Sequence, residues 1–252
     1  MTQEEGVQGL EFGAVPPGRR RLAPTLLWLV VSALFIVSIP AFLISTNARW
    51  AINEPKLYNL GFAQFNVPES TGISQEQLER GGQQIRDYFN NDAEFLDLRV
   101  ILNGTEVSLY KEREVLHMGD VKGLIQGVYK LQLASLAYLL IASASVFYLF
   151  RREGLARLSR LAILGAGLTL GIGAVVGIAS LVAWNQVFLL FHYISFDNLL
   201  WILNPRTDYL IRMFPTSFFL TATILIAGVT LAECGVLVLL ARFVRRRWAA
   251  TE

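Results

Sequence analysis

Four long apolar segments divide the chain, and each can form a helix that crosses a lipid bilayer. They cover residues 24–46, 131–150, 161–183 and 217–241. A hydrocarbon core about 30 Å thick requires about 20 helical residues, which each segment supplies. The pattern therefore predicts a mainly α-helical membrane protein with four transmembrane helices.

Clusters of arginine at the ends of these segments predict their direction. Residues 19–21 are all arginine, the connection 151–160 contains four arginines, and four more lie within 242–252. Positive charge is retained on the cytoplasmic side of a membrane, so this connection and the two tails, 1–23 and 242–252, are predicted to be cytoplasmic. Both termini are then inside the cell, and the remaining two segments form an extracytoplasmic face: 47–130 and 184–216.

The composition agrees with a membrane protein and excludes other classes. Of the 252 residues, 54% are hydrophobic and 17% are charged, whereas about 25% are charged in soluble proteins. The net charge of +2 is too small to indicate a nucleic acid partner. Cys234 is the single cysteine, which excludes an intramolecular disulfide, and the sequence has no nucleotide or redox-cofactor motif. We therefore expect no cofactor and no nucleotide partner.

Two features inside the apolar segments allow more than one interpretation. Gly167 with Gly171, and Gly173 with Gly177, are small-xxx-small pairs, which favour close helix packing over a groove for lipid. Glu233 lies within the fourth segment, where an ionisable group is costly. It is interpreted as a neutral acid, a carboxylate that reaches the cytoplasmic interface, or a proton relay.

The long external segment, 47–130, is predicted to form a small α+β cap. Ser74 to Asn90 suits a helix that begins with a capping box formed by Ser74 and Gln77. Alternating apolar residues on both sides of Asn103-Gly104 predict a β-hairpin. Glu112 to Lys122 then favours a second helix that ends at Gly123.

The shorter external segment, 184–216, is unusually rich in apolar and aromatic residues. Aromatic rings favour the depth at which a membrane meets water, so the segment is predicted to be a loop that lies in the outer interface and contacts lipid. Arg206 and Arg212 are candidates for contact with lipid phosphates or a carboxylate. The aromatic residues concerned include Trp184, Tyr193, Trp201 and Tyr209.

The chain has only two histidines, His117 and His192, and the topology places one on each external segment. Imidazoles titrate near neutral pH, so a pair can remove and donate protons in acyl transfer. Asp120 is the i+3 neighbour of His117 and can hold its tautomer, unless a cation such as Lys122 neutralises it. Asp197 follows His192 closely. A single packed histidine is the alternative interpretation of each residue.

Two further considerations bear on this pair. Zinc would need a third ligand such as Asp120 or Glu114, and no His-Glu-x-x-His motif is present, so no metal is expected. An unbroken helix from His117 to Arg151 would be roughly 51 Å long, which would place His117 too high to meet His192. A break at Gly119, Gly123 or Gly127 is therefore predicted.

Several stretches around the histidines resemble a bacterial family of four-span membrane proteins, the lipoprotein intramolecular transacylases. The resemblance extends from the first apolar segment to the fourth, and its most specific part is His-Met-x-Asp-Val-Lys at residues 117–122. Residues 1–18 are an additional tail. The other matching stretches are Glu112 to Leu116, Phe191 to Phe196, Asn198 to Trp201 and Asp208 to Pro215.

The resemblance implies an acyltransferase that needs no cofactor. Its substrate would be the diacylated N-terminus of a lipoprotein, in the cell membrane, where the sn-2 acyl chain of S-diacylglyceryl-cysteine moves to the α-amine of the same cysteine. His117 and His192 would act as acid and base, and Tyr193 or Arg206 would help to stabilise the oxyanion. The alternatives are a non-enzymatic membrane protein whose cap binds lipid or a partner protein, and a transporter, for which no inverted repeat is evident.

Overall fold

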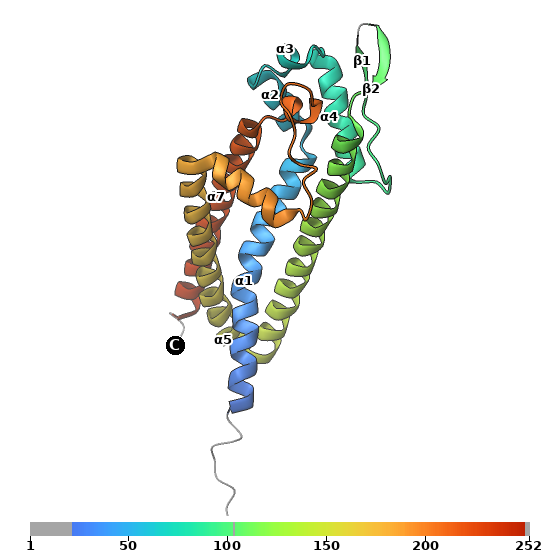
Figure 1. Ribbon diagram of the computed structural model, residues 1–252. Coiled ribbons are helices and arrows are strands. Elements are labelled where there is room, and N and C mark those ends of the chain that lie inside the picture. The colour runs from blue at the N-terminus through green and yellow to red at the C-terminus, as the bar shows by residue number, and fades with distance from the viewer. Residues whose placement is uncertain (1–21, 103, 250–252) are drawn as a thin grey trace, which may run out of the picture.

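The computed structural model describes residues 22–102 and 104–249, and it is mainly helical (Figure 1). Arg19, Arg20 and Arg21 of the predicted cytoplasmic tail lie outside the described residues, as does Asn103 of the predicted turn. Three of the described helices are long and apolar enough to cross a membrane: α1 (Leu22–Asn53), α5 (Glu112–Ser195) and α7 (Thr216–Ala249).

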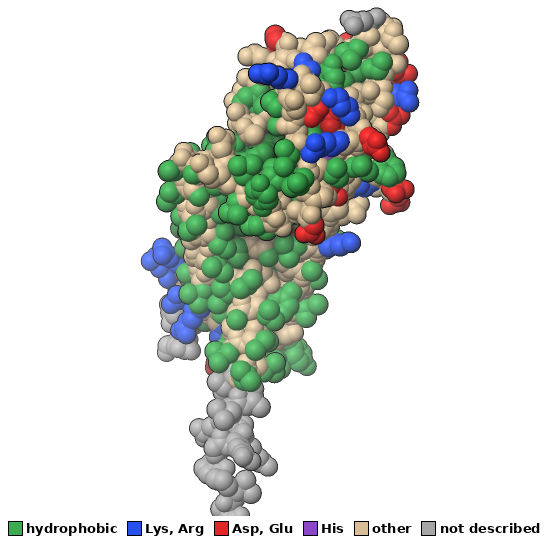
Figure 2. Space-filling model, in the orientation of Figure 1, with side chains coloured by type: hydrophobic (Ala, Val, Ile, Leu, Met, Phe, Trp, Pro, Cys, Tyr) green, Lys and Arg blue, Asp and Glu red, His purple; other side chains and the backbone are tan. Residues whose placement is uncertain are grey.

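These three helices pack side by side as a bundle (Figure 1). Phe35 and Ile39 of α1 are buried against Ala142 and Leu161 of α5. The outer surface of the bundle is covered with large apolar side chains, as Figure 2 shows along its lower half. Val182, for example, is 82% exposed. Such a surface is stable in hydrocarbon and not in water, so the chain is a membrane protein.

The helix α5 is 84 residues long but is not straight. Arg151 has φ 50° and ψ −121°, and Figure 1 shows that α5 descends, reverses at its lower end and ascends again. The reversal is tight, because a Cβ atom on Gly154 would lie 2.7 Å from the carbonyl oxygen of Val146. The predicted connection 151–160 is therefore helical apart from Arg151.

The first limb of α5 contradicts two predictions. No residue between Glu112 and Phe150 has non-helical backbone angles, so the helix does not end at Gly123 and has no break at Gly119, Gly123 or Gly127. A glycine permits a break without requiring one, and both predictions therefore fail. The only other irregular residue described within α5 is Ala183, with φ −142° and ψ 48°.

The cap consists of short helices and one hairpin above the bundle (Figure 1). A shared apolar core that includes Phe62, Leu78 and Leu98, each 0% exposed, holds them together. The predicted capping box at Ser74 does not form, because the Gln77 side chain binds the backbone N–H and C=O of Ile101 instead. The elements are α2 (Pro55–Gln64), α3 (Val67–Thr71), α4 (Gln75–Phe89), β1 (Arg99–Leu102) and β2 (Thr105–Ser108).

The two strands pair antiparallel, with Val100 opposite Val107 and Leu102 opposite Thr105. Gly104 has φ +80°, a left-handed conformation that glycine adopts without strain. This is the position at which the sequence predicts a tight turn. The hairpin is held to α4 through the side chains of Gln77 and Gln84.

The segment that follows Ala183 is not a loop throughout, contrary to the prediction for 184–216. Residues 184–195 continue as helix, and a short helix α6 (Tyr209–Met213) precedes α7. Met213 is 0% exposed and belongs to the apolar core of the cap. The part of the chain between α5 and α7 is therefore packed against the cap at its C-terminal end.

A buried carboxylate connects α6 to the start of α5. Glu114 is 0% exposed, and it accepts hydrogen bonds from the backbone N–H of Leu210 at 2.6 Å and of Lys111 at 2.9 Å. Lys111 also pairs with Asp208 at 2.7 Å. Burial raises the pKa of Glu114, since the charged form loses hydration, and the two backbone N–H groups oppose this shift.

Glu233, in α7, faces α1. Its carboxylate accepts a hydrogen bond from the side-chain amide of Asn47 at 2.7 Å, and the same amide donates to Thr230 at 2.9 Å. A polar group inside a bundle is stabilised by such partners, and a bond of this kind connects the two helices.

The predicted packing role of the two glycine pairs is wrong. A Cβ atom added at any of the four positions would meet open space, whereas one added at Gly165 would lie 2.4 Å from Ile39 Cδ1 and 2.9 Å from Ile39 Cβ. The close approach of α1 and α5 therefore depends on Gly165. The four glycines that face open space are Gly167, Gly171, Gly173 and Gly177.

Replacing Gly165 by valine should destabilise the bundle by about 1–3 kcal/mol, because the added atoms overlap Ile39. Thermal unfolding of the purified protein in detergent would show a lower Tm. Gly167→Val is the matched control, since that position has room for the side chain. Equal Tm values for the two variants would contradict this account of the packing.

Candidate functional site

The two histidines lie together although 75 positions separate them in the sequence. The ring centroids of His117 and His192 are 6.2 Å apart. His117 is on the first limb of α5, and His192 is on the helical segment after Ala183, which Figure 1 shows crossing back toward the first limb. The first limb is unbroken, yet it does not separate the two rings, because the helical segment 184–195 brings His192 to His117.

Aromatic rings enclose the pair. Phe188 and Trp201 lie 4.3 Å and 5.0 Å from His192 between ring centroids, and Phe196 lies 5.1 Å from His117. His117 is 6% exposed and His192 8% exposed. The pair therefore occupies a water-poor position, where hydrogen bonds and charges act more strongly than in bulk water.

The tautomer of His192 follows from one hydrogen bond. Its Nδ1 lies 2.7 Å from the carbonyl oxygen of Phe188, one helical turn earlier. A carbonyl oxygen only accepts, so Nδ1 must carry the proton, and in the neutral ring Nε2 has a free lone pair. Burial lowers the pKa of His192, and the bond to Phe188 opposes this shift. His192 is thus a neutral base at physiological pH.

His117 differs from His192 in its hydrogen bonding. Its Nδ1 is buried and has no hydrogen-bond partner among the described residues. Burial, with a smaller contribution from His192, lowers the pKa of His117 to about 4, so this ring is also neutral at physiological pH. A buried polar atom without a partner is costly in a folded protein and is a reason to expect a ligand or a reacting group there.

The loop that covers the histidines is tied to α5 by polar contacts. Asn198 donates to Asp120 at 2.9 Å, and Arg113 donates to the backbone carbonyl oxygens of Leu199 and Leu200. Asp120 was expected to hold the tautomer of His117, but its hydrogen bond in the structure goes to Asn198. We call residues 196–201 the covering loop.

Two other predicted supporting residues, Lys122 and Tyr193, make their contacts with groups other than the two histidine rings. The ammonium group of Lys122 binds the carbonyl of Ala93 at 2.6 Å and lies 4.2 Å from the ring centroid of Tyr88, so it connects α5 to the cap. Tyr193 is 63% exposed and packs edge-on against Trp201.

Asp197 and Arg206 are both exposed side chains in the part of the chain between α5 and α6. Neither side chain forms a hydrogen bond or an ion pair with the rest of the described residues. The structure thus leaves them available to a substrate without placing them against the histidines.

Sequence reasoning missed the residues that position the pair. The Phe188 carbonyl and the Arg113 contacts depend on main-chain geometry, which the sequence pattern does not specify. The i−4 relation of Phe188 to His192 becomes visible only if residues 184–195 are interpreted as a helix, and the unbroken apolar run 187–191 before His192 hid that period. Among the described residues, no group of three His, Cys, Asp or Glu side chains is arranged to hold a metal ion.

Comparisons with known proteins agree with the geometry. The family described as "Lipoprotein intramolecular transacylase Lit" matches residues 33–219. A solved structure of the membrane-integral lipoprotein intramolecular transacylase Lit from Bacillus cereus has a TM-score of 0.72 at 18% identity, covering 88% of this chain and 98% of that one. A variant of the same enzyme with one histidine replaced by arginine has a TM-score of 0.74 at 18% identity, covering 93% and 100%.

The structural likeness concerns the fold, because identity at this level carries no residue roles. No curated protein sequence matches the chain. The family match covers most of the chain, including both histidines and the covering loop. The chain therefore belongs to the lipoprotein intramolecular transacylase family.

Proposed function

We propose that this protein transfers an acyl chain within a lipoprotein, from the sn-2 oxygen of S-diacylglyceryl-cysteine to the α-amine of the same cysteine. The observation that carries the proposal is the pair of buried, neutral imidazoles, His117 and His192, with ring centroids 6.2 Å apart. Membership of the family supports the substrate class.

The reaction balances without a cofactor. The amine nitrogen attacks the ester carbonyl carbon, a C–N bond forms, the C–O bond to glycerol breaks, and the amine proton goes to the glycerol oxygen. The amide product is more stable than the ester, so the transfer needs no other energy source. Because donor and acceptor belong to one molecule, positioning supplies a large part of the rate.

His192 is the proposed base. Its Nδ1–H is held by the Phe188 carbonyl, so Nε2 accepts the amine proton and then returns it to the glycerol oxygen. His117 lies close enough to donate its N–H to the oxyanion of the tetrahedral intermediate, a role that suits a neutral ring in a water-poor site. Tyr193 and Arg206 are further candidates for substrate contact from the exposed side.

The proposed topology places this site at the outer leaflet. In it, α1 and α7 each cross the membrane once and the two limbs of α5 cross it twice, with Arg151 at the cytoplasmic turn and both termini inside. The membrane-spanning segments in this topology keep the boundaries predicted from the sequence: 24–46, 131–150, 161–183 and 217–241. The helical segment 184–195 exposes Leu190, Tyr193 and Ile194 by 59%, 63% and 75%, which suits contact with lipid at the interface.

Replacing either histidine should abolish transfer. His192→Ala is expected to lower the rate at least about 100-fold, since general acid–base catalysis contributes that much, and His117→Ala to lower it by a similar factor. The measurement is mass spectrometry of a reporter lipoprotein N-terminus from cells without other N-acylation. Glu106→Ala, on the exposed strand β2, is the control. Unchanged N-acylation in both histidine variants would favour the non-enzymatic alternative.

The pH dependence should report the burial of His192. Because its pKa lies below the ordinary value of 6.5, activity should stay constant around neutral pH and fall only in more acidic solution, where the base is protonated. Trp201→Ala admits water, raises this pKa toward 6.5 and should move the acid limb to higher pH. Rate profiles of the two proteins test this, with Phe95→Ala in the cap as control. Superimposable profiles would refute it.

Substrate must pass the covering loop to reach the rings, and the loop is tied to α5 by the bond from Asn198 to Asp120. Asn198→Asp places two carboxylates opposite each other and should detach the loop. We expect a several-fold lower kcat and faster hydrogen exchange in 196–201. Double replacement with Asp120→Asn restores a donor and an acceptor, and should recover both values. Failure of that rescue would show that the contact does not position the loop.

A further inference from the structure

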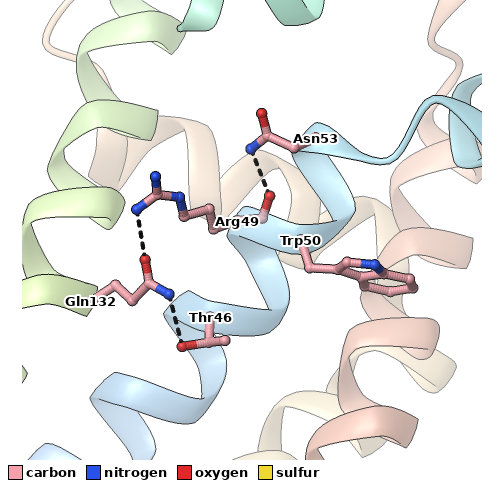
Figure 3. Close-up of a pocket in the computed structure, with 5 residues that line it drawn as sticks. All are labelled: Thr46, Arg49, Trp50, Asn53 and Gln132. Atoms are coloured by element: carbon pink, nitrogen blue, oxygen red, sulfur yellow. Dashed lines mark hydrogen bonds between the residues drawn. The ribbon is translucent and has the colours of Figure 1, made fainter. Parts of the chain in front are cut away.

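A second polar site lies between α1 and the first limb of α5, apart from the histidine pair. It is an open pocket of about 340 Å³, within the size range of small-ligand sites. Figure 3 shows Arg49 and Gln132 reaching toward each other from the two helices, with Trp50 projecting away from them. The pocket is lined by Thr46, Arg49, Trp50, Asn53 and Gln132.

The guanidinium of Arg49 is fixed in place. It lies 4.4 Å from the ring centroid of Tyr129, and Nη1 donates to the side-chain oxygen of Gln132 at 2.9 Å. Gln132 is itself oriented, because its amide donates to the hydroxyl of Thr46 at 3.1 Å. Only one of the five guanidinium N–H donors is used by these contacts, so most of the fork remains available.

The charge of Arg49 is not compensated by protein. Within residues 22–102 and 104–249, no carboxylate forms an ion pair with Arg49. Some arginines of the cap do pair with carboxylates, such as Arg80 with Glu76 at 2.6 Å and Arg99 with Asp97 at 2.8 Å. A held, uncompensated cation beside a pocket is a site for an anion.

The depth of the pocket selects the kind of anion. Arg49 follows directly after the first apolar segment, and its neighbour Trp50 is 43% exposed. Tryptophan is enriched at the headgroup level of a bilayer, and an arginine near the end of a span extends its charged group to the same level. A guanidinium fork matches the oxygens of a phosphate group.

We propose that this pocket binds the phosphodiester of a membrane phospholipid, with the guanidinium of Arg49 as its main contact. None of the residues that line this pocket belongs to the histidine site, and the lipoprotein substrate named above carries no phosphate, so the proposal does not depend on the proposed function.

Native mass spectrometry of the full chain in detergent tests the proposal with three probes: phosphatidylglycerol, a diacylglycerol with the same acyl chains, and inorganic phosphate. Phosphatidylglycerol should be retained, the diacylglycerol lost, and millimolar inorganic phosphate should not displace the lipid. Arg49→Gln should weaken retention about tenfold, since it removes a charged hydrogen-bond donor. Arg80→Gln, an exposed cap arginine, should leave it unchanged.

Equal retention of phosphatidylglycerol and diacylglycerol, or of phosphatidylglycerol by wild type and Arg49→Gln, would overturn the proposal. Displacement by inorganic phosphate at low millimolar concentration would also overturn it, since the site would then take a free anion. If Arg49→Gln does not fold, photolabelling of the wild-type protein tests the proposal instead. A phosphatidylglycerol with a photoreactive headgroup should label residues 46–53, and labelling confined to other segments would refute the site.

Discussion

The hydrogen bond from His192 to the carbonyl of Phe188 depends on the helical conformation of residues 184–195, and the arrangement of the site depends on both. In a helix the carbonyl four residues earlier points along the axis toward the side chain that follows it, so the ring is fixed by its own segment. The irregular backbone at Ala183 directs that segment across the bundle. The same 12 residues thus determine where His192 lies and which nitrogen carries its proton.

Burial contributes to function as well as to stability here. The rings of Phe188, Phe196 and Trp201 exclude water from the histidines, which keeps both imidazoles neutral and leaves the Nδ1 of His117 without a partner among the residues that the structure describes. Such a site costs folding energy, and the cost is offset in the cap. The buried carboxylate of Glu114 and the apolar core around Met213 hold α6 in place, which anchors the covering loop from its far end.

The sequence was informative where a pattern had one physical cause. Long apolar runs identified the helices α1, α5 and α7, and alternation around Gly104 identified the hairpin. It failed where two conformations suit the same residues. Gly119, Gly123 and Gly127 permit a break, yet the continuous hydrogen bonding of α5 retains the helix. Residues 187–191 are all apolar, and such a run has no period that separates an interfacial loop from a helix. The two histidines were found by their rarity, whereas the partners that position them act through backbone atoms.

The unbroken first limb of α5 makes the protein sensitive to the thickness of its bilayer. At about 1.5 Å per residue, residues 112–150 form a rod of roughly 58 Å, about twice the hydrocarbon core. Helices adapt to thinner or thicker membranes by changing their tilt. His117 is fixed to this rod, and the covering loop that follows His192 is tied to the same rod through Asn198 and Arg113, so both rings move with the rod when its tilt changes.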